Sequence, residues 1–156
     1  MKRRTTAGFS LIEALVVVSI ICVLAAIAIP MSSSAVRTYR LSAAVAATAG
    51  AIQTTRYQAI MHGYQYQLTL TSSTLSYQVY SMVPPATTFS AVGTAVPISR
   101  PGDVTIGRTV TYQFKADGTV TETSTPPNMV FSIANSVGRS NTITVSRVGN
   151  VSVTTP

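Results

Sequence analysis

The sequence is poor in the residues on which most enzymes and disulfide-rich scaffolds depend. Its 156 residues include one cysteine, one histidine, four acidic residues and no tryptophan. One cysteine excludes an internal disulfide framework and a multi-cysteine zinc site. So few acidic groups leave little material for acid–base catalysis, and the length allows one domain. We therefore expect a protein that is not an enzyme and that uses no cofactor and no metal.

Charge is also scarce, and it is unevenly placed. Only 10% of the residues are charged, with a net charge of +7, and three of the basic residues fall within the first eight positions. Residues 31–156 carry eight basic and three acidic side chains, a net charge of +5. Scattered arginines are typical of a solvated surface. A basic patch that binds polyanions is the alternative.

One long apolar run stands out. Residues 9–29 contain a single charge, that of Glu13, and the whole chain has a mean hydropathy of +0.35. As an α-helix this run would span roughly 32 Å, enough to cross the hydrocarbon core of a bilayer. The basic residues before it, and the few charges just after it, orient the N-terminus toward the cytoplasm. We expect the remainder of the chain to be exported.

Two simple interpretations of this run each leave something unexplained. A secretory signal peptide would have a shorter apolar core before a cleavage site such as the one that Ala25, Ala26 and Ala28 loosely offer. A plain single-pass anchor fits the length and the flanks but does not explain Glu13. A carboxylate costs about 2 to 3 kcal/mol at the bilayer centre, less near an interface, so it indicates a function.

A third interpretation explains both the length and the carboxylate. The string GFSLIEALVVVSIICVLAAIAIP, residues 8–30, follows a short basic leader. It resembles the N-terminus of type IV prepilins and type II secretion pseudopilins. The resemblance implies that a prepilin peptidase cuts between Gly8 and Phe9 and that Phe9 becomes N-methylated. It also makes Glu13 the fifth residue of the mature chain, with a role in assembly, and Pro30 the helix-kinking proline of the family.

The physical consequences of such processing can be followed from the residues. Cleavage before Phe9 leaves the apolar helix attached to the product and creates an α-amino group that is positively charged near neutral pH. An unpaired Glu13 would be costly in an apolar bundle of helices, and the N-terminal ammonium of a neighbouring subunit can neutralise it. We therefore expect Glu13 to set the register between subunits.

Beyond Pro30 the sequence predicts that the helix continues over residues 31–62 and ends at Gly63. One face has apolar residues at helical spacing, suited to packing on a sheet: Leu41, Val45, Ala49, Ile52 and Ile60. A second strip of small residues is either internal core or a surface that another helix can approach closely: Ala43, Ala47 and Gly50. The arginines between the strips are expected to reach solvent: Arg37, Arg40 and Arg56.

From Tyr64 onward the pattern changes to period two, which predicts β-strands. Asp117-Gly118 is a hairpin signal, and residues 84–101, with four prolines, indicate a loop or an irregular edge strand. The predicted fold is α+β, a long N-terminal α-helix packed on an antiparallel β-sheet of six to eight strands. The expected organisation is a leader (1–8), a transmembrane and assembly helix (9–29), its periplasmic continuation (30–63) and a β-rich periplasmic domain (64–156).

This layout also resembles the H-type pseudopilins and the FimT/FimU minor pilins, over residues 56–70 and the closing hairpin at 141–153. A C-terminal disulfide loop and an acidic calcium-binding loop are missing, which favours a minor, H-like subunit. The resemblance implies a structural subunit of a type II secretion pseudopilus, held in the bacterial inner membrane before assembly. The implied partners are other pilins or pseudopilins, the prepilin peptidase, the inner-membrane assembly platform and the lipid bilayer.

Two rivals stay open. The first is a minor pilin of a type IV pilus that acts in pilus assembly or DNA uptake. Some FimT-like proteins bind DNA through a Gly-Arg-x-Arg segment, for which Arg139 and Arg147 are the nearest candidates here. Asn141 and Asn150 stand where that motif needs arginine, so DNA binding is not favoured. The second rival is a single-pass membrane protein with a periplasmic adhesion domain.

The remaining chemically capable residues have structural explanations. His62 stands beside the predicted helix end without an acidic neighbour, and we expect it to cap the helix or face solvent. Asp103 and Asp117 are expected in turns. Cys22 lies in the apolar run and is expected to act as a small hydrophobe.

Overall fold

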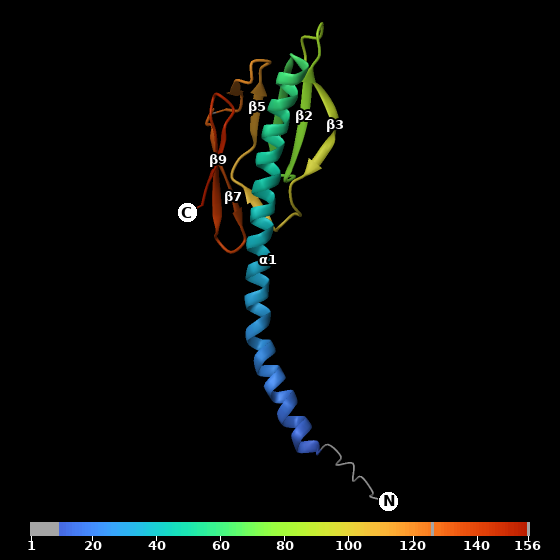
Figure 1. The fold of residues 1–156 in the computed structure, drawn as a ribbon, viewed down its shortest axis with the longest axis vertical. Helices are drawn as coiled ribbons and strands as arrows, with labels where there is room; N and C mark the ends of the chain where they lie inside the picture. The colour runs from blue at the N-terminus through green and yellow to red at the C-terminus, as the bar shows by residue number, and fades with distance from the viewer. Residues whose placement is uncertain (1–9, 126, 156) are drawn as a thin grey trace, which may run out of the picture. The chain divides into compact units, whose positions relative to one another are not determined.

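A computed structural model of the chain describes residues 10–125 and 127–155. Over these residues it contains one helix followed by nine strands, and it divides into two compact units, Met1–Val36 and Arg37–Pro156 (Figure 1). The predicted α+β class, a long N-terminal helix on antiparallel strands, is confirmed. The elements are α1 (Leu11–His62), β1 (Gln65–Thr71), β2 (Ser76–Met82), β3 (Ser90–Pro97), β4 (Val104–Ile106), β5 (Val110–Phe114), β6 (Val120–Glu122), β7 (Val130–Asn135), β8 (Ser140–Val145) and β9 (Val151–Thr154).

Helix α1 is continuous through Pro30 and ends where the sequence predicts. Pro30 removes one backbone donor without interrupting the helix, because neighbouring turns keep their own hydrogen bonds. At the C-terminal end, Gly63 adopts a φ of 73° and donates its N–H to the carbonyl of Ala59 over 3.1 Å. A residue with a Cβ would be strained at this φ, which explains the glycine at the helix end.

The part of α1 in the second unit buries one face against the strands. The buried residues recur every three or four positions, as one face of a helix requires: Leu41, Ala44, Val45, Thr48, Ala51, Ile52, Thr55 and Ala59. The predicted stripe is correct at Leu41, Val45 and Ile52, but Ala49 is half-buried and Ile60 is exposed. The stripe drifts because 3.6 residues per turn does not keep a four-residue spacing on one line.

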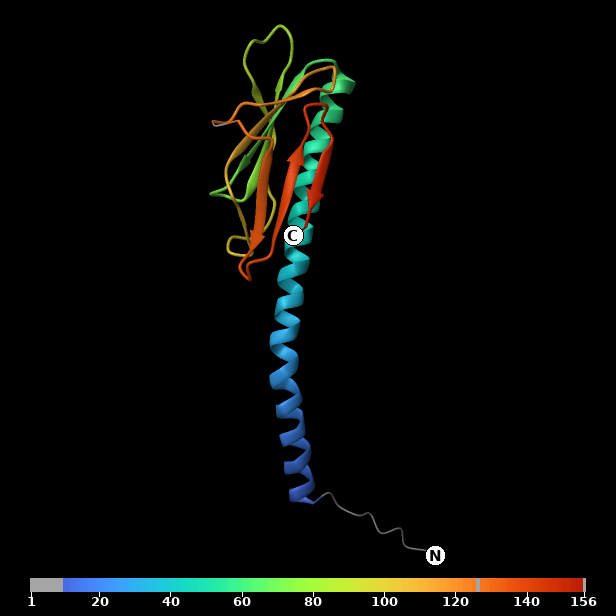
Figure 2. The ribbon, with the colours of Figure 1, turned by 90° about the vertical axis from the view of Figure 1, so that its left-hand side faces the viewer.

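The strands form two sheets, so the expectation of a single sheet of six to eight strands is wrong. One has the order β3-β2-β1-β5-β6 and the other β4-β7-β8-β9, with antiparallel pairing throughout. Both lie along the same stretch of α1 in the two views (Figures 1 and 2). Their inner faces and the helix share one core, in which Leu68, Tyr112, Ile133 and Ile143 are fully buried.

Strand β3 confirms the prediction of an edge strand within residues 84–101. It lies at the outer end of the five-stranded sheet, and all eight of its residues are exposed. Its pairing with β2 shifts register between Tyr77 and Val79. Because none of its residues is buried, β3 contributes little to the core.

Candidate functional site

The first unit consists of an apolar helix without a protein core to cover it. Within the described residues, α1 is the helix long and apolar enough to cross a membrane, and its most apolar 18-residue window has a mean hydropathy of 2.9 with no residue buried. Large apolar side chains are exposed all around it, among them Leu11, Val17, Ile21 and Leu24. A helix that is apolar on every face needs lipid or other apolar helices around it.

Glu13 is the acidic residue in the first turn of this helix. Its carboxylate has no hydrogen-bond or ion-pair partner among residues 10–125 and 127–155. The helix dipole favours a negative charge at this position, whereas apolar surroundings oppose it because they take the charge out of water. Gly8 and Phe9, where cleavage and methylation are predicted, lie outside the described residues. A kink at Pro30 stays a prediction.

The small-residue strip of α1 is not core. Ala43, Ala47 and Gly50 are exposed. Ala47 and Gly50 line a groove of about 450 Å³ between α1 and strands β2 and β3, together with Val92 and Val96 of the edge strand. Close approach of another helix to this strip stays a prediction.

The two arginines proposed for DNA contact are not brought together. Arg139 lies in the turn between β7 and β8, where the Asn135 N–H donates to the carbonyl of Arg139 over 2.8 Å. Arg147 lies in the turn between β8 and β9, where its carbonyl accepts the N–H of Val120 over 2.8 Å. Strand β8 separates the two turns, which Figure 2 shows at its opposite ends. DNA contact by either arginine stays a prediction.

Arg56 has a structural role that the sequence did not reveal. It was expected in solvent, but its Nε donates to the carbonyl of Gly118 over 3.0 Å, and the side chain also packs on Gly149. Both glycines are buried and have a φ of 81°. A Cβ at Gly149 would lie 2.3 Å from the Arg56 Nε. One helix arginine thus holds the turns of two hairpins that belong to different sheets.

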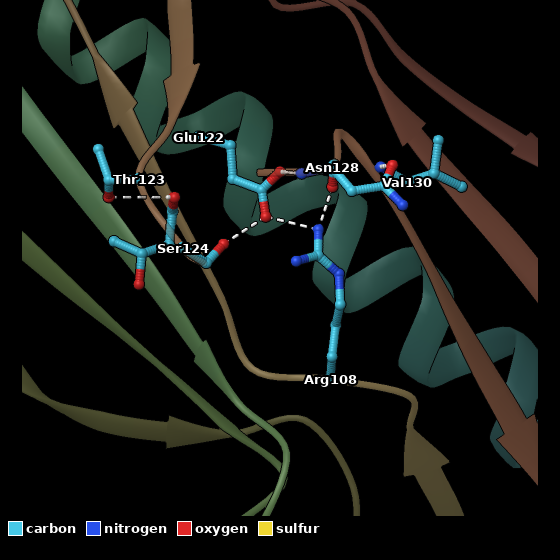
Figure 3. Close-up of polar contacts among 7 residues, drawn as sticks. Arg108, Glu122, Thr123, Ser124, Asn128 and Val130 are labelled. Carbon is cyan, nitrogen blue, oxygen red and sulfur yellow. Dashed lines mark hydrogen bonds and ion pairs between the residues drawn. The ribbon is translucent and has the colours of Figure 1, made fainter. Parts of the chain in front are cut away.

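A second unexpected feature is a buried ion pair between Arg108 and Glu122 (Figure 3). The Arg108 Nη2 lies 2.5 Å from the Glu122 Oε1, and the Glu122 side chain is 1% exposed. Glu122 also accepts hydrogen bonds from the Ser124 hydroxyl and the backbone N–H of Asn128, and Arg108 donates to the Asn128 carbonyl. The pair joins the segment between β4 and β5 to β6, and both residues bond to Asn128 in the segment that leads into β7. The scattered arginines were expected on a solvated surface, and Arg108 departs from that expectation because it pairs with a buried carboxylate.

The burial of Glu122 could have been inferred from the strand pattern. Val120, Thr121 and Glu122 alternate buried, exposed, buried in β6. Glu122 therefore shares the core-facing side with Val120, two residues after the Asp117-Gly118 turn. A charge at such a position needs a buried partner.

Tyr112 is fully buried, and its hydroxyl has no hydrogen-bond partner among the described residues. Burial raises the pKa of Tyr112 above its ordinary value, and the neighbouring Glu122 carboxylate raises it further. Tyr66 behaves similarly, since burial and its contact with Tyr64 raise the pKa of Tyr66 to about 12. Both phenols are thus held in their neutral form by the folded state.

Replacing Tyr112 by phenylalanine is expected to leave the free energy of unfolding unchanged or to raise it by about 1 kcal/mol, because a buried hydroxyl without a partner is removed. The pKa of Tyr112 is higher in the folded chain than in the unfolded chain, which favours folding at neutral pH and below. That contribution falls as pH rises above the ordinary value of 10.0, where the unfolded chain ionises and the folded chain does not. Denaturant titrations between neutral pH and pH values above 10 should show a smaller alkaline loss for the phenylalanine variant. A clearly less stable variant at neutral pH would contradict this assignment.

The structure places three further residues where the sequence predicts them: His62, Asp103 and Asp117. An ion pair of Asp103 is an added contact that the sequence did not predict. The His62 Nδ1 lies 2.9 Å from the Gln58 carbonyl oxygen and 3.1 Å from the Tyr66 hydroxyl, at the helix end. The Asp117 Oδ1 accepts the N–H and hydroxyl of Thr119, whose hydroxyl bond lowers the pKa of Asp117. Asp103 lies in a turn and also forms an ion pair with Arg40 at 2.5 Å. No group of three potential metal ligands occurs in the part of the chain that the structure describes.

The described residues combine an exposed apolar helix, one carboxylate in its first turn, and an α+β domain whose core the same helix enters. The prokaryotic N-terminal methylation motif matches residues 3–29 of the chain. This match supports a pilin-like protein of a pilus or a pseudopilus, with processing by prepilin peptidase and assembly with other pilins. No curated protein and no solved structure matches the chain.

Proposed function

We propose that this chain is a minor pilin-like structural subunit, an H-type pseudopilin of a type II secretion pseudopilus that takes part in protein secretion across the outer membrane. The observation that carries the proposal is the division of α1 into two chemically different parts. Residues 11–36 expose apolar side chains with a single carboxylate, while the part after Arg37 is the core of a folded domain. Such a helix can move from lipid into a bundle of identical helices without unfolding the domain.

In this proposal the chain is a non-enzyme that works mechanically. It starts as a single-pass protein of the inner membrane, with its N-terminus in the cytoplasm and its α+β domain in the periplasm. The prepilin peptidase removes residues 1–8, the assembly platform adds the subunit to the filament, and other pseudopilins surround its helix. The second candidate is a minor pilin of a type IV pilus. Its DNA-uptake form is disfavoured by the separation of Arg139 and Arg147.

The experiment that tests the proposal measures processing. Intact-mass analysis of the chain from cells with an active prepilin peptidase should show loss of residues 1–8 and one added methyl group on Phe9. Replacing Gly8 by valine should block the cut, because a branched side chain hinders access to the scissile bond. A leader that remains on the wild-type chain in its native host would exclude this function and favour the adhesion-domain rival.

Deletion of the gene separates the two filament assignments. Loss of secretion of folded proteins with pili unchanged supports the pseudopilin. Loss of pili or of DNA uptake with secretion unchanged supports the type IV pilus subunit instead.

A further inference from the structure

One end of the second unit gathers arginines from three separate segments. Strand pairing of Val104 with Asn135 joins β4 to β7 and sets the turn at residues 100–103 beside the turn at residues 135–139. Figures 1 and 2 both show these two turns at the same end of the sheets. Two helix arginines bond to them: Arg37 Nη1 donates to the Ser136 hydroxyl over 3.1 Å, and Arg40 Nη1 donates to Asp103 over 2.5 Å.

This surface, the arginine end, consists of Arg37, Arg40, Arg100 and Arg139, which are all exposed. Asp103 is the one acidic residue of these segments, so the arginine end carries a net charge of +3. The opposite end of β8 carries Arg147 in its turn. Arg56 and Lys115 also lie at that end, together with Asp117, so it has a net charge of +2 and the arginine end is the more positive of the two.

The backbone beneath the arginine end is held in place. The Asn135 side chain, in a residue that is 6% exposed, accepts the backbone N–H groups of Val137 and Arg139 at 3.1 and 3.0 Å. On the neighbouring turn, the Asp103 N–H donates to the Arg100 carbonyl over 3.2 Å. The arginines thus project from ordered turns, which lowers the entropy lost when they bind a ligand.

The chain itself keeps this end near a membrane. The apolar run ends at Ile29 and the second unit begins at Arg37, eight residues later. Even fully extended, eight residues reach at most about 28 Å. Whatever the orientation of the two units, a bilayer that holds the apolar run therefore lies no further than this distance from Arg37.

We propose that the arginine end binds anionic phospholipid headgroups of the membrane that holds helix α1. Guanidinium groups bind phosphate through two parallel hydrogen bonds, and basic residues near an anionic leaflet are attracted over about one Debye length. The contact fixes the folded domain on the membrane surface before the subunit enters a filament. This inference rests on the membrane anchoring in the proposed function.

The test uses the full chain in lipid nanodiscs, one set of phosphatidylcholine and one of equal parts phosphatidylcholine and phosphatidylglycerol. Amide hydrogen exchange is measured at residues 100–103 and 135–139, at low and at high salt. We expect slower exchange at both turns in the phosphatidylglycerol discs, with the protection lost at high salt. Each arginine removed should weaken the headgroup contact by about fivefold.

One variant removes positive charge from the arginine end, and a control variant removes positive charge from the opposite end of the second unit. Arg37→Gln, Arg100→Gln and Arg139→Gln together should abolish the lipid-dependent protection, whereas Arg147→Gln with Lys115→Gln should leave it intact. Arg40 is kept because its loss would leave Asp103 without its ion pair. Thermal unfolding of each variant checks that the domain remains folded.

Three results would overturn the inference. Equal exchange in both lipid compositions refutes headgroup binding while the anchoring still stands. A chain that does not stay in the nanodisc refutes the anchoring and the inference together. Stronger protection of the same turns by double-stranded DNA, in discs of phosphatidylcholine alone, assigns the arginine end to DNA instead.

Discussion

Replacing Glu122 by alanine is expected to lower the free energy of unfolding by about 3 kcal/mol, the lower end of what removing one partner of a buried ion pair costs. The Glu122 side chain is 1% exposed and that of Arg108 is 27% exposed. The substitution leaves the guanidinium without its carboxylate, and it leaves the Asn128 N–H and the Ser124 hydroxyl without their acceptor. Partial exposure of Arg108 lets water recover some of this loss, which is why we expect the lower figure.

The measurement is chemical unfolding of the full chain in a neutral detergent, followed by the near-ultraviolet signal of tyrosine. All seven tyrosines lie in the second unit, so the signal reports on the α+β domain and not on the apolar helix. Ser124→Ala, which removes one donor and no charge, is the matched control and should cost about 1 kcal/mol. A loss below that figure for Glu122→Ala would contradict the importance of the pair.

A double substitution tests how much of this loss comes from groups other than the unpaired charge of Arg108 and the space left by Glu122. Arg108→Met with Glu122→Leu removes both charges and keeps apolar volume in place. Because desolvation offsets much of the Coulomb attraction of a buried pair, the double variant should be more stable than Glu122→Ala alone. Equal stability of the two variants would show that the cost comes from the Ser124 and Asn128 donors, which lose their acceptor in both variants.

The local features of this fold followed from the sequence because each has a local cause. The long helix follows from its apolar residues and ends at a glycine with a positive φ, and the Asp117-Gly118 turn is set by the residues within it. The strand alternation of residues 65–71 was visible because one face is buried. These signals depend on neighbours within a few positions.

The division into two sheets, and the contacts made by Arg56 and Arg108, could not be predicted in the same way. Arg56 meets Gly118 and Gly149, which are 62 and 93 positions further along the chain, and its partners depend on how the hairpins pair. The pairing of β4 with β7 likewise joins segments with β5 and β6 between them. Register at such separations is fixed by the packing of the whole domain, for which a single sequence has no local signal.

The same contrast, between features with a local cause and features that depend on strand pairing, applies to the candidate site. The apolar helix with Glu13 near its start was predicted correctly, because composition alone defines it. The role of Glu13 in assembly stays a prediction. Arg139 and Arg147 were predicted as the nearest matches to a Gly-Arg-x-Arg segment, and strand β8 places them in the turns at its two ends. Arg37, Arg40 and Arg100 were expected as scattered surface charge, and the pairing of two turns brings them to one end of the domain.

Replacing Glu13 by alanine is expected to abolish incorporation into filaments while leaving membrane insertion intact. The carboxylate is the one charge in an apolar run of 21 residues, so removing it makes the run more apolar and favours insertion. Assembly is expected to fail because the ammonium at Phe9 of an adjacent subunit then has no carboxylate to neutralise it. A buried charge that loses its partner costs about 3 to 5 kcal/mol, which corresponds to a hundredfold or greater loss in assembly equilibrium.

Two variants separate this role from general effects on the helix. Glu13→Gln keeps the size and polarity of the side chain and removes only its charge, so it should assemble as poorly as the alanine variant. Ser19→Ala removes a polar side chain of the same run, whose hydroxyl donates to the Val16 carbonyl, and should assemble normally. The amounts of each variant in sheared filaments and in membranes, measured by quantitative immunoblotting, give the two readouts. Filaments that contain the glutamine variant at the wild-type level would mean that polarity, and not charge pairing, sets the register between subunits.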